Sequence, residues 1–502
     1  MQRGTKEGCM KGTRMDILTR VFEWVEDTNQ PNVLWLSGSP GAGKSAIAST
    51  VVSQLLEHQQ VLSSAFWFKR GDASLGDPAS LWCTIAFQLA CLNPTIQQNV
   101  VDVLGQLDLE TAGVEDHFKH LIESSLFKCP PFQCVVIVLD ALDECGSTAS
   151  RKQLLCTLQR WMELPKNCKL LVTSRAESDI KRCFDTGTQH IELKTGSLVN
   201  RETSGDVFFF LNSEFVRIAQ DYNSLPSRWP GEPVIIELTS RAAGLFIWAK
   251  TVIRFLEEDV PEERLALIMD GKLGTGDIDK LYRTILNNAF ETARIGTAKS
   301  ILGTIVLGQI ALQDIDLQNL LGETMGTIEF VLQRMQSVIV RDTKHGIGIT
   351  HMSFADFLCD PNRSGDFYID PQTLNQRLAL SCLQIMNSGL EFNICKLETS
   401  HLANDMVADL DKRVENNIPS HLKYACQFWA EHFNGAPNKY PESEFKKGIQ
   451  DLLFIHLLHW LEVLSVIRAV PTAPYALKAM HEWVKVSLIQ YILEQEFRDC
   501  LS

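Results

Sequence analysis

Apolar and polar positions alternate in two different ways along the chain. Between residues 33 and 193, short apolar runs are separated by longer stretches in which apolar residues recur every three or four positions. This alternation is typical of strands joined by crossover helices, so we expect βαβ units around a parallel sheet. The unbroken apolar run at 134–139 indicates a central strand covered on both faces. The predicted strands read VLWL (33–36), SAFWF (64–68), CVVIVLD (134–140), CKLLVTS (168–174) and HIEL (190–193).

Helical periodicity precedes and follows this stretch. Residues 1–30 show one amphipathic helix, and beyond about residue 195 the spacing again predicts helices, including the stretches 206–219 and 234–258. The apolar residues of the first helix are Ile17, Leu18, Val21, Phe22 and Val25.

Two departures from the helical pattern lie in the second half. The glycine-rich stretch at 271–277 is a candidate hinge. Residues 337–358 read as a strand, a turn at Lys344–Gly346, a short strand and a helix. Two strands beside helices in this order predict a winged helix, and the pattern from 370 onward is helical again.

Composition narrows the class of protein. The 502 residues are 45% apolar and 22% charged, which predicts a globular chain of about three domains. The formal net charge of −14 argues against a broad electrostatic grip on nucleic acid. The first 18 residues lack the apolar core of a signal peptide. The most apolar stretch, at 452–467, carries two histidines and a glutamate, so we interpret it as a buried helix rather than a membrane span.

The 14 cysteines are scattered singly, without a C-x-x-C pair. Cys129 and Cys134 have no partner pair at zinc spacing. This usage predicts buried, reduced thiols and a cytoplasmic protein.

A glycine-rich stretch follows the first predicted strand. Within LWLSGSPGAGKSAIAS (34–49), residues 38–45 fit G-x-x-x-x-G-K-[ST] between a strand and a helix. Glycines let backbone N–H groups turn toward a phosphate, and the following helix directs its positive end at the same anion. Lys44 would reach the β- and γ-phosphates, and Ser45 would ligate Mg²⁺. The candidate binding residues are Gly38, Ser39, Pro40, Gly41, Ala42, Gly43, Lys44, Ser45 and Ala46.

A second, acidic motif ends the central strand. Asp140 should emerge at the carboxyl edge of the sheet, on a strand neighbouring that of the glycine-rich stretch, and hold Mg²⁺ through water. Asp143 or Glu144 could orient or deprotonate the attacking water, with Glu144 preferred. The alternative is that these two acids cap the next helix.

The next predicted strand ends in Thr173, Ser174 and Arg175. If this strand neighbours that of Asp140, the Arg175 guanidinium could sense a γ-phosphate. The alternative is an arginine paired with a surface acid.

With these motifs in this order, the chain resembles the NACHT NTPases of the STAND class of signalling switches. Family members carry the acidic pattern that reads Asp140-Ala141-Leu142-Asp143-Glu144 here. The segments at 9–25 and 65–90 are similar to those of fungal NACHT proteins.

The resemblance implies further site residues. The segment 242–252 looks like the part of the small helical domain that closes over adenine, with Phe246 where relatives often have proline. The segment 349–358 is similar to a winged-helix motif in which a histidine binds the β-phosphate of ADP, which here is His351. From the residues alone, a histidine between a strand and a helix is more often a core residue whose ring nitrogens are hydrogen-bonded within the fold. The stretches 418–433 and 454–466 look like the helical region that precedes a repeat array in fungal relatives. We expect neither that array nor an N-terminal effector domain in this sequence, which is then either a fragment or a switch without an output and a sensor of its own.

The expected fold is therefore an α/β P-loop NTPase domain followed by helical and winged-helix domains and an α-helical C-terminal region. The resemblance implies a switch that binds ATP or ADP with Mg²⁺, hydrolyses slowly and self-associates when activated, as in innate immunity or heterokaryon incompatibility. ATP is preferred over GTP because no Asn-Lys-x-Asp motif occurs. The alternatives are a continuously cycling AAA+-like ATPase and a non-catalytic scaffold with a vestigial site. The predicted domains are 1–30 (lead segment), 31–194 (NTPase), 195–275 (small helical), 276–365 (winged helix) and 366–502 (C-terminal helical).

Overall fold

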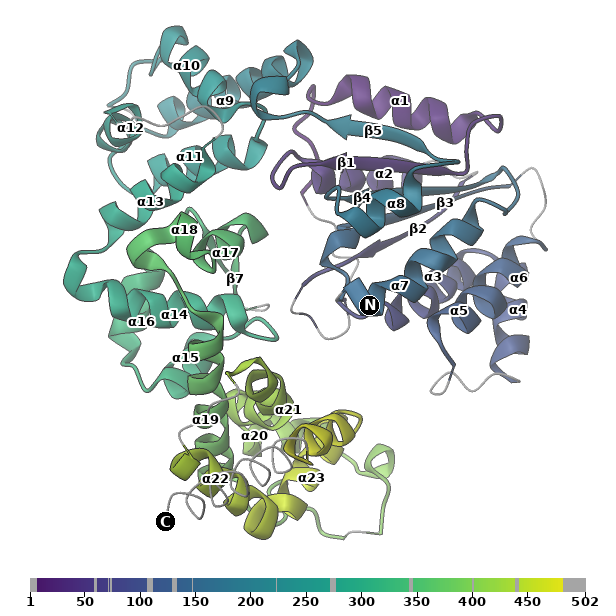
Figure 1. Cartoon of the computed structure of the whole chain (residues 1–502), viewed down its shortest axis with the longest axis vertical. Coiled ribbons are helices and arrows are strands. Elements are labelled where there is room, and N and C mark those ends of the chain that lie inside the picture. The colour runs from purple at the N-terminus through teal and green to yellow at the C-terminus, as the bar shows by residue number, and fades with distance from the viewer. Residues whose placement is uncertain are drawn as a thin grey trace, which may run out of the picture. The chain divides into compact units, whose positions relative to one another are not determined.

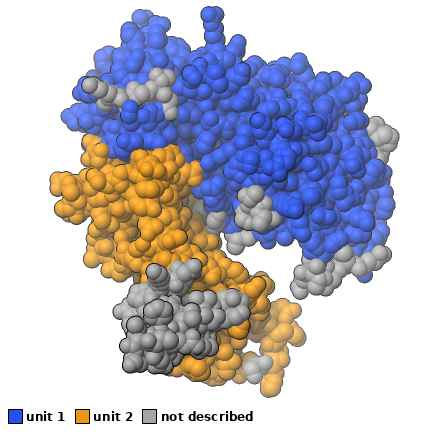
Figure 2. Space-filling view, in the orientation of Figure 1, with its two compact units in different colours: residues 1–285, 351–353 blue, residues 286–350, 354–502 orange. Residues whose placement is uncertain are grey.

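The computed structural model divides into two compact units, coloured separately in Figure 2. Unit 1 comprises residues 1–285 and 351–353, and unit 2 comprises residues 286–350 and 354–502. The structure describes residues 7–57, 61–70, 72, 75–105, 112–128, 133–146, 148–222, 224–270, 277–342, 346–399, 401–437 and 442–481.

Unit 1 contains a five-stranded sheet in the order β2-β3-β4-β1-β5, and every neighbouring pair is parallel (Figure 1). All five predicted strands are present. The prediction that the acidic strand neighbours the glycine-loop strand is wrong, because β4 lies between β1 and β3. The strands are β1 (Val33–Gly38), β2 (Val61–Trp67), β3 (Cys134–Asp140), β4 (Cys168–Ser174) and β5 (Gln189–Leu193).

Each face of the sheet is covered by apolar side chains from helices. Alternate residues of β1 point to opposite faces, so Leu34 and Leu36 join one core while Val33 and Trp35 join the other. The first core is completed by α1 (Met15–Glu26) and α2 (Lys44–Glu57). The second core draws on α3 (Ala79–Leu92), α4 (Pro94–Leu104), α5 (Val114–His117), a π-helical turn (Phe118–Glu123), α6 (Ser124–Leu126), α7 (Thr148–Trp161) and α8 (Ser178–Phe184).

A group of helices follows the sheet. The apolar stretch at 234–258 is divided by Ala243 and Gly244, whose φ angles of 47° and 80° are incompatible with a continuous helix. Residues 271–276 of the predicted hinge lie outside the described part of the chain. The helices are α9 (Arg201–Asp221), α10 (Glu232–Ala242), α11 (Phe246–Glu257), α12 (Pro261–Asp270) and α13 (Ile278–Ala289).

Unit 2 begins with three helices followed by two antiparallel strands, which is the element order of a winged helix. Residues 344 and 345 of the predicted turn lie outside the described residues. These elements are α14 (Ile295–Leu307), α15 (Asp314–Leu321), α16 (Met325–Gln333), β6 (Ile339–Asp342) and β7 (Gly346–Ile349). They are followed by α17 (Met352–Leu358), α18 (Pro361–Ser364), α19 (Pro371–Gly389), α20 (Leu410–Asn417), α21 (Ser420–Gly435), α22 (Glu442–Asp451), a π-helical turn (Leu452–His456) and α23 (Leu457–Val466).

The predicted buried helix at 452–467 is buried on one side only. Trp460 is fully buried, whereas Phe454 and Leu458 are 83% and 75% exposed. Among the described residues, the stretch Phe445–Val466 is the one that has the length and mean hydropathy of a membrane-crossing helix, with 33% of its most apolar window buried. Core helices of soluble proteins can meet the same criteria.

Candidate functional site

The glycine-rich loop runs from the end of β1 into the start of α2, as predicted. Gly41 and Gly43 adopt φ angles of 79° and 95°, a left-handed backbone conformation that residues with a Cβ rarely adopt. Lys44 opens α2, and Ser45 and Ala46 follow in its first turn. The loop therefore lies at the positive end of a 14-residue helix, a favourable position for an anion.

Lys44 holds the loop from within. Its Nζ donates to the carbonyls of Gly38 (2.7 Å) and Ser39 (3.0 Å). Burial lowers the pKa of Lys44 to about 8, although the nearby carboxylates of Asp143 and Asp140 oppose this shift. The ammonium group is thus poorly solvated and would gain from a phosphate close to it.

Asp140 ends β3 at the same carboxyl edge of the sheet and is fully buried. The Thr173 hydroxyl from β4 donates to Asp140 Oδ1 at 2.6 Å and accepts from the Ala141 N–H at 3.0 Å. β4 thus bridges the two strands that carry the motifs and fixes how the Asp140 carboxylate is oriented.

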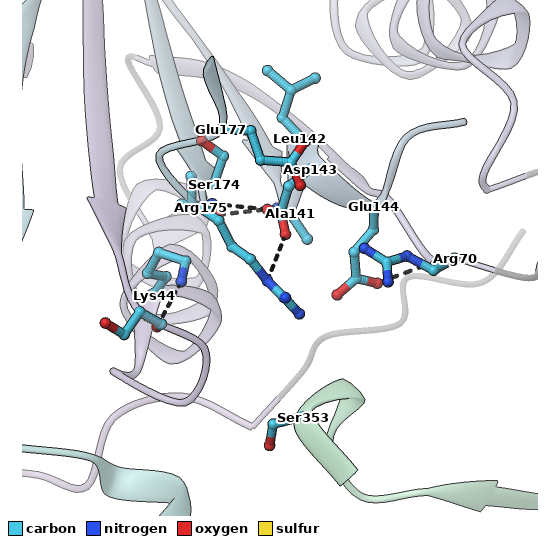
Figure 3. A network of polar contacts seen from close by, with 12 residues as sticks. Lys44, Arg70, Ala141, Leu142, Asp143, Glu144, Ser174, Arg175, Glu177 and Ser353 are labelled. Atoms are coloured by element: carbon cyan, nitrogen blue, oxygen red, sulfur yellow. Dashed lines mark hydrogen bonds and ion pairs between the residues drawn. The ribbon is translucent and has the colours of Figure 1, made fainter. Parts of the chain in front are cut away.

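Asp143 binds Arg175 through two contacts (Figure 3). Asp143 Oδ1 accepts from the Arg175 backbone N–H and Oδ2 from Nε, both at 3.0 Å. The Asp143 side chain is only 4% exposed, so this arginine is paired with a buried acid of the motif itself, not with a surface acid. β4 does neighbour β3, as the role proposed for Arg175 required.

Glu144 has a different partner. Its Oε2 accepts from the backbone N–H of Arg70 at 3.3 Å (Figure 3). Arg70 follows β2, whose carboxyl end meets the same edge as that of β3. Sequence analysis missed Arg70, although its place just after a predicted parallel strand was a usable signal.

Arg151 supports the acidic turn from α7. Its guanidinium binds Asp179 at 2.9 Å and Glu177 at 2.5 Å, and Nη1 donates to the Leu142 carbonyl at 3.4 Å. Arg151 is 2% exposed. The buried Arg151 guanidinium thus ties the acidic turn, through Leu142, to the segment that follows Arg175, and no local sequence pattern marked this arginine.

Arg14, which sequence analysis also missed, contacts the glycine loop through its side chain. Its Nη2 donates to the Ala42 carbonyl at 2.7 Å, and its Nη1 donates to the Thr203 hydroxyl of α9 at 2.8 Å. The guanidinium carbon lies 4.8 Å from the centroid of the Phe246 ring. The aromatic residue that the resemblance connects with adenine therefore contacts a buried cation.

The start of α11 touches the loop directly. The Ile247 N–H donates to the Gly41 carbonyl at 3.2 Å. A Cβ at Gly41 would lie 1.9 Å from Ile247 Cγ2 and 3.8 Å from Cε1 of His351, which groups with unit 1.

His351 Nδ1 shares a hydrogen bond with the Ser353 hydroxyl (2.7 Å), and Ser353 shares another with the Tyr282 hydroxyl (2.8 Å).

A metal at this site would need ligands beyond the protein. Among the residues that the structure describes, no group of three or more His, Cys, Asp or Glu side chains is placed to hold a metal ion. Ser45 and Asp140 supply two oxygen donors of the kind that Mg²⁺ accepts, with phosphate oxygens and water completing its shell. The donor set thus fits a nucleotide-bound Mg²⁺.

The parallel sheet, the glycine-rich loop and the acidic strand end define an α/β fold of the P-loop NTPase class. Residues 12–175 match the protein family described as Nephrocystin 3, N-terminal. Over 510 aligned positions and 95% of its length, the chain is 23% identical to the vegetative incompatibility protein HET-E-1 of Podospora anserina. The chain spans 36% of that relative. These matches confirm the predicted resemblance to fungal NACHT-domain STAND proteins.

The solved structures that match the chain include two archaeal ATPases, both with TM-scores below 0.5. One is a STAND protein with a tetratricopeptide repeat sensor from Pyrococcus horikoshii, which is 12% identical over 96% of this chain and 66% of that chain, with a TM-score of 0.43. The other is a Walker-type ATPase of Pyrococcus abyssi, which is 13% identical over 70% of this chain and 97% of that chain, with a TM-score of 0.35.

Proposed function

We propose that this chain is a nucleotide-dependent signalling switch that binds ATP or ADP with Mg²⁺ and hydrolyses the triphosphate slowly. The observation that carries the proposal is the position of the glycine loop, Lys44 and Asp140 at the carboxyl edge of one parallel sheet. Likeness to a vegetative incompatibility protein supports a signalling role. We further propose that the protein acts in the cytoplasm and self-associates when triphosphate is bound.

The loop binds phosphate through its backbone. Its left-handed glycines allow N–H groups to face an anion, and the α2 N-terminus adds positive potential. Lys44 exchanges the carbonyls of Gly38 and Ser39 for phosphate oxygens. The lysine gains a charge-assisted hydrogen bond in a poorly solvated place, which favours the phosphate-bound state.

Ser45 and Asp140 are the residues that would hold Mg²⁺, which neutralises phosphate charge when bound. Thr173 keeps the Asp140 carboxylate in one orientation. Since Asp143 is bound to Arg175, Glu144 is the carboxylate we assign to the attacking water. Arg175 would leave Asp143 to contact a γ-phosphate.

His351 is the residue we assign to the diphosphate state. Its Cε1 lies 3.8 Å from the position a Cβ would take at Gly41. The hydrogen bond from Ser353 at Nδ1 orients the ring. A histidine held this close to the loop can bind a phosphate oxygen through its other nitrogen.

The test is the nucleotide that co-purifies with the protein, released by denaturation and identified by chromatography. We expect bound ADP in the wild type and in Lys152→Ala, which removes an exposed lysine of α7. Lys44→Ala should purify empty and bind ADP at least roughly tenfold more weakly in calorimetry. Equal affinity in Lys44→Ala would contradict the proposal.

Two further measurements separate the alternatives. Steady-state hydrolysis well above about one turnover per second would identify a cycling ATPase rather than a switch. A folded wild type that binds neither ATP nor ADP would indicate a scaffold. Faster ADP release from His351→Ala than from the wild type is expected, and equal release rates would remove His351 from the mechanism.

A further inference from the structure

Arg14 is a buried cation that the proposed chemistry leaves unexplained. It immediately precedes α1, adopts a left-handed φ of 58°, and is 2% exposed. Burial lowers its pKa, while the charge of Asp206 opposes this effect. Placing a guanidinium in such surroundings is costly unless its partners repay the lost hydration.

Those partners belong to three separate elements. The guanidinium binds the Ala42 carbonyl of the glycine loop and the Thr203 hydroxyl of α9, and it lies over the Phe246 ring of α11. The Arg14 backbone N–H also donates to Asp206 of α9 at 3.1 Å. One side chain therefore joins the loop to two helices that lie outside the sheet domain in sequence.

The segment that leads to Arg14 is attached as well. The Cys9 N–H donates to the Thr50 hydroxyl of α2 at 2.8 Å, and Glu7 forms an ion pair with Lys250 of α11. A Cβ at Gly8 would lie 2.9 Å from Thr50 Oγ1, so the backbone passes close to α2. We call residues 7–14 the strap.

The carbonyls of the glycine loop show what the strap does. A carbonyl oxygen that faces a phosphate repels it, so a phosphate loop must direct its carbonyls elsewhere. At Gly38 and Ser39 the donor is Lys44 of the loop itself, which leaves these carbonyls when phosphate binds. At Gly41 and Ala42 the donors come from outside it, namely Ile247 of α11 and Arg14 of the strap.

We propose that Arg14 is a positioning residue that holds the Ala42 carbonyl away from the phosphates and clamps the loop to α9 and α11. Loss of this clamp loosens the loop and speeds nucleotide release, so the strap and the nucleotide are energetically coupled. The inference rests on the proposed nucleotide binding. Arg14 and the strap act on the nucleotide through the loop and take no part in the hydrolysis step.

The experiment measures the dissociation rate of a fluorescent ADP analogue chased with excess ADP. Arg14→Ala should release the analogue roughly tenfold faster, because it removes hydrogen bonds from a charged donor. Thr203→Val removes a single partner and should give a smaller increase. Arg14→Lys should not restore the wild-type rate, since a lysine lacks the two separate amino groups that bind Ala42 and Thr203 and the planar face that lies over Phe246. Arg20→Ala, which removes an exposed arginine of α1, is the matched control and should stay within twofold of the wild type.

Thermal unfolding and limited trypsin digestion accompany the release measurement. Thr203→Val should unfold at nearly the wild-type temperature while releasing nucleotide faster, a combination that a purely structural role would not give. Cleavage after the exposed Lys11 should accelerate in Arg14→Ala. Unchanged release rates in folded Arg14→Ala and Thr203→Val would overturn the inference. A wild type that binds neither nucleotide overturns the proposed function and the coupling together, and the trypsin result then shows separately whether Arg14 fastens the strap.

Discussion

Asp143 and Glu144 are adjacent carboxylates of one short turn, yet they have different partners. Asp143 is buried and bound by the backbone N–H and the side chain of Arg175, whereas the partners of Glu144 include the backbone N–H of Arg70. A carboxylate bound to a guanidinium must give up that contact before it can bind a water molecule. The environment of each acid, rather than its place in the motif, therefore favours Glu144 for the attacking water.

At the same scale, the proton on Lys44 should control nucleotide affinity. With a pKa of about 8, the free lysine is mostly charged at pH 7 and mostly neutral at pH 9. Bound phosphate favours the charged form and raises this pKa, so binding takes up a proton at high pH. ADP affinity should fall roughly tenfold between pH 7 and pH 9.

Calorimetry at the two pH values, in buffers of different ionisation enthalpy, measures both the affinity and the proton uptake. Lys44→Arg is the comparison, because arginine stays charged throughout this range. If the wild type loses affinity no faster than Lys44→Arg, the lowered pKa of Lys44 plays no part in binding.

Two of the arginines that sequence analysis missed, Arg14 and Arg70, bind partners that lie far away along the chain. The partners of Arg14 lie 28 and 189 positions away along the chain, and the partner of Arg70 lies 74 positions away. Neither arginine stands in a short motif whose spacing indicates chemistry. The glycine-rich loop was recognisable because its residues act within eight consecutive positions. Long-range partners become visible only when the fold brings them together.

Among the elements, strands buried on both faces were predicted best. β3 and β4 begin and end where the apolar runs do, because a central parallel strand contacts apolar side chains on each side. β2 begins at Val61, three residues before the predicted start. The serines of β2 interrupt the apolar run. The Ser64 hydroxyl donates a hydrogen bond to the Gln88 side chain, a contact that the sequence did not reveal.

The contact between α11 and the glycine loop leads to a second prediction. Gly41→Ala would force a Cβ into a left-handed φ and place it 1.9 Å from Ile247 Cγ2. The strained φ alone costs about 1 kcal/mol, and the clash adds to it. ADP affinity should therefore fall at least roughly tenfold, measured by calorimetry.

A companion variant separates the two causes. Gly41→Ala combined with Ile247→Ala removes the 1.9 Å contact with Cγ2 but leaves the 2.8 Å contact with the Cβ of residue 247, so it should recover part of the affinity. Gly205→Ala is the control, because a Cβ on that α9 glycine meets nothing within 4 Å, and it should stabilise the protein by about 0.5–1 kcal/mol. If Gly41→Ala binds ADP as tightly as the wild type, the loop accepts a Cβ at position 41 and the prediction is wrong.

For the whole molecule, the division into units differs from a simple succession of domains. Unit 1 contains the sheet and the helices as far as Ile285, together with His351–Ser353 from a later part of the chain. The chain thus passes between the units three times. The domain boundaries predicted from sequence stay predictions, but this return of three residues was not visible in the apolar pattern.

Unit 2 should be sensitive to acid. Burial lowers the pKa of His432 to about 4, and its ring nitrogens are bonded to Tyr424 and Asn375. The unfolded chain binds a proton near pH 6.5, so stability is lost as the pH falls from 6.5 toward 4. The free energy of unfolding should drop by about 2 kcal/mol between pH 7 and pH 5 from this residue.

Urea unfolding at both pH values, followed by fluorescence of the unit 2 tryptophans, measures this loss. His432→Gln removes the titrating group and should flatten the dependence, although it also lowers stability at pH 7. His401→Gln, at an exposed position of the same unit, should behave as the wild type does. If the free energy of unfolding of His432→Gln still falls between pH 7 and pH 5 as in the wild type, groups other than His432 cause the loss.

The order of strands in unit 1 also determines when the glycine loop can be completed during synthesis. In the described sheet β1 pairs only with β4 and β5. Val33 of β1 therefore cannot pair until its partner Leu170 has been synthesised. A ribosome adding about 5–20 residues each second needs roughly 7–30 s to make the intervening stretch. Through that interval the nascent β1 and its loop have no strand to pair with, so chaperones that bind exposed apolar segments have their best opportunity there.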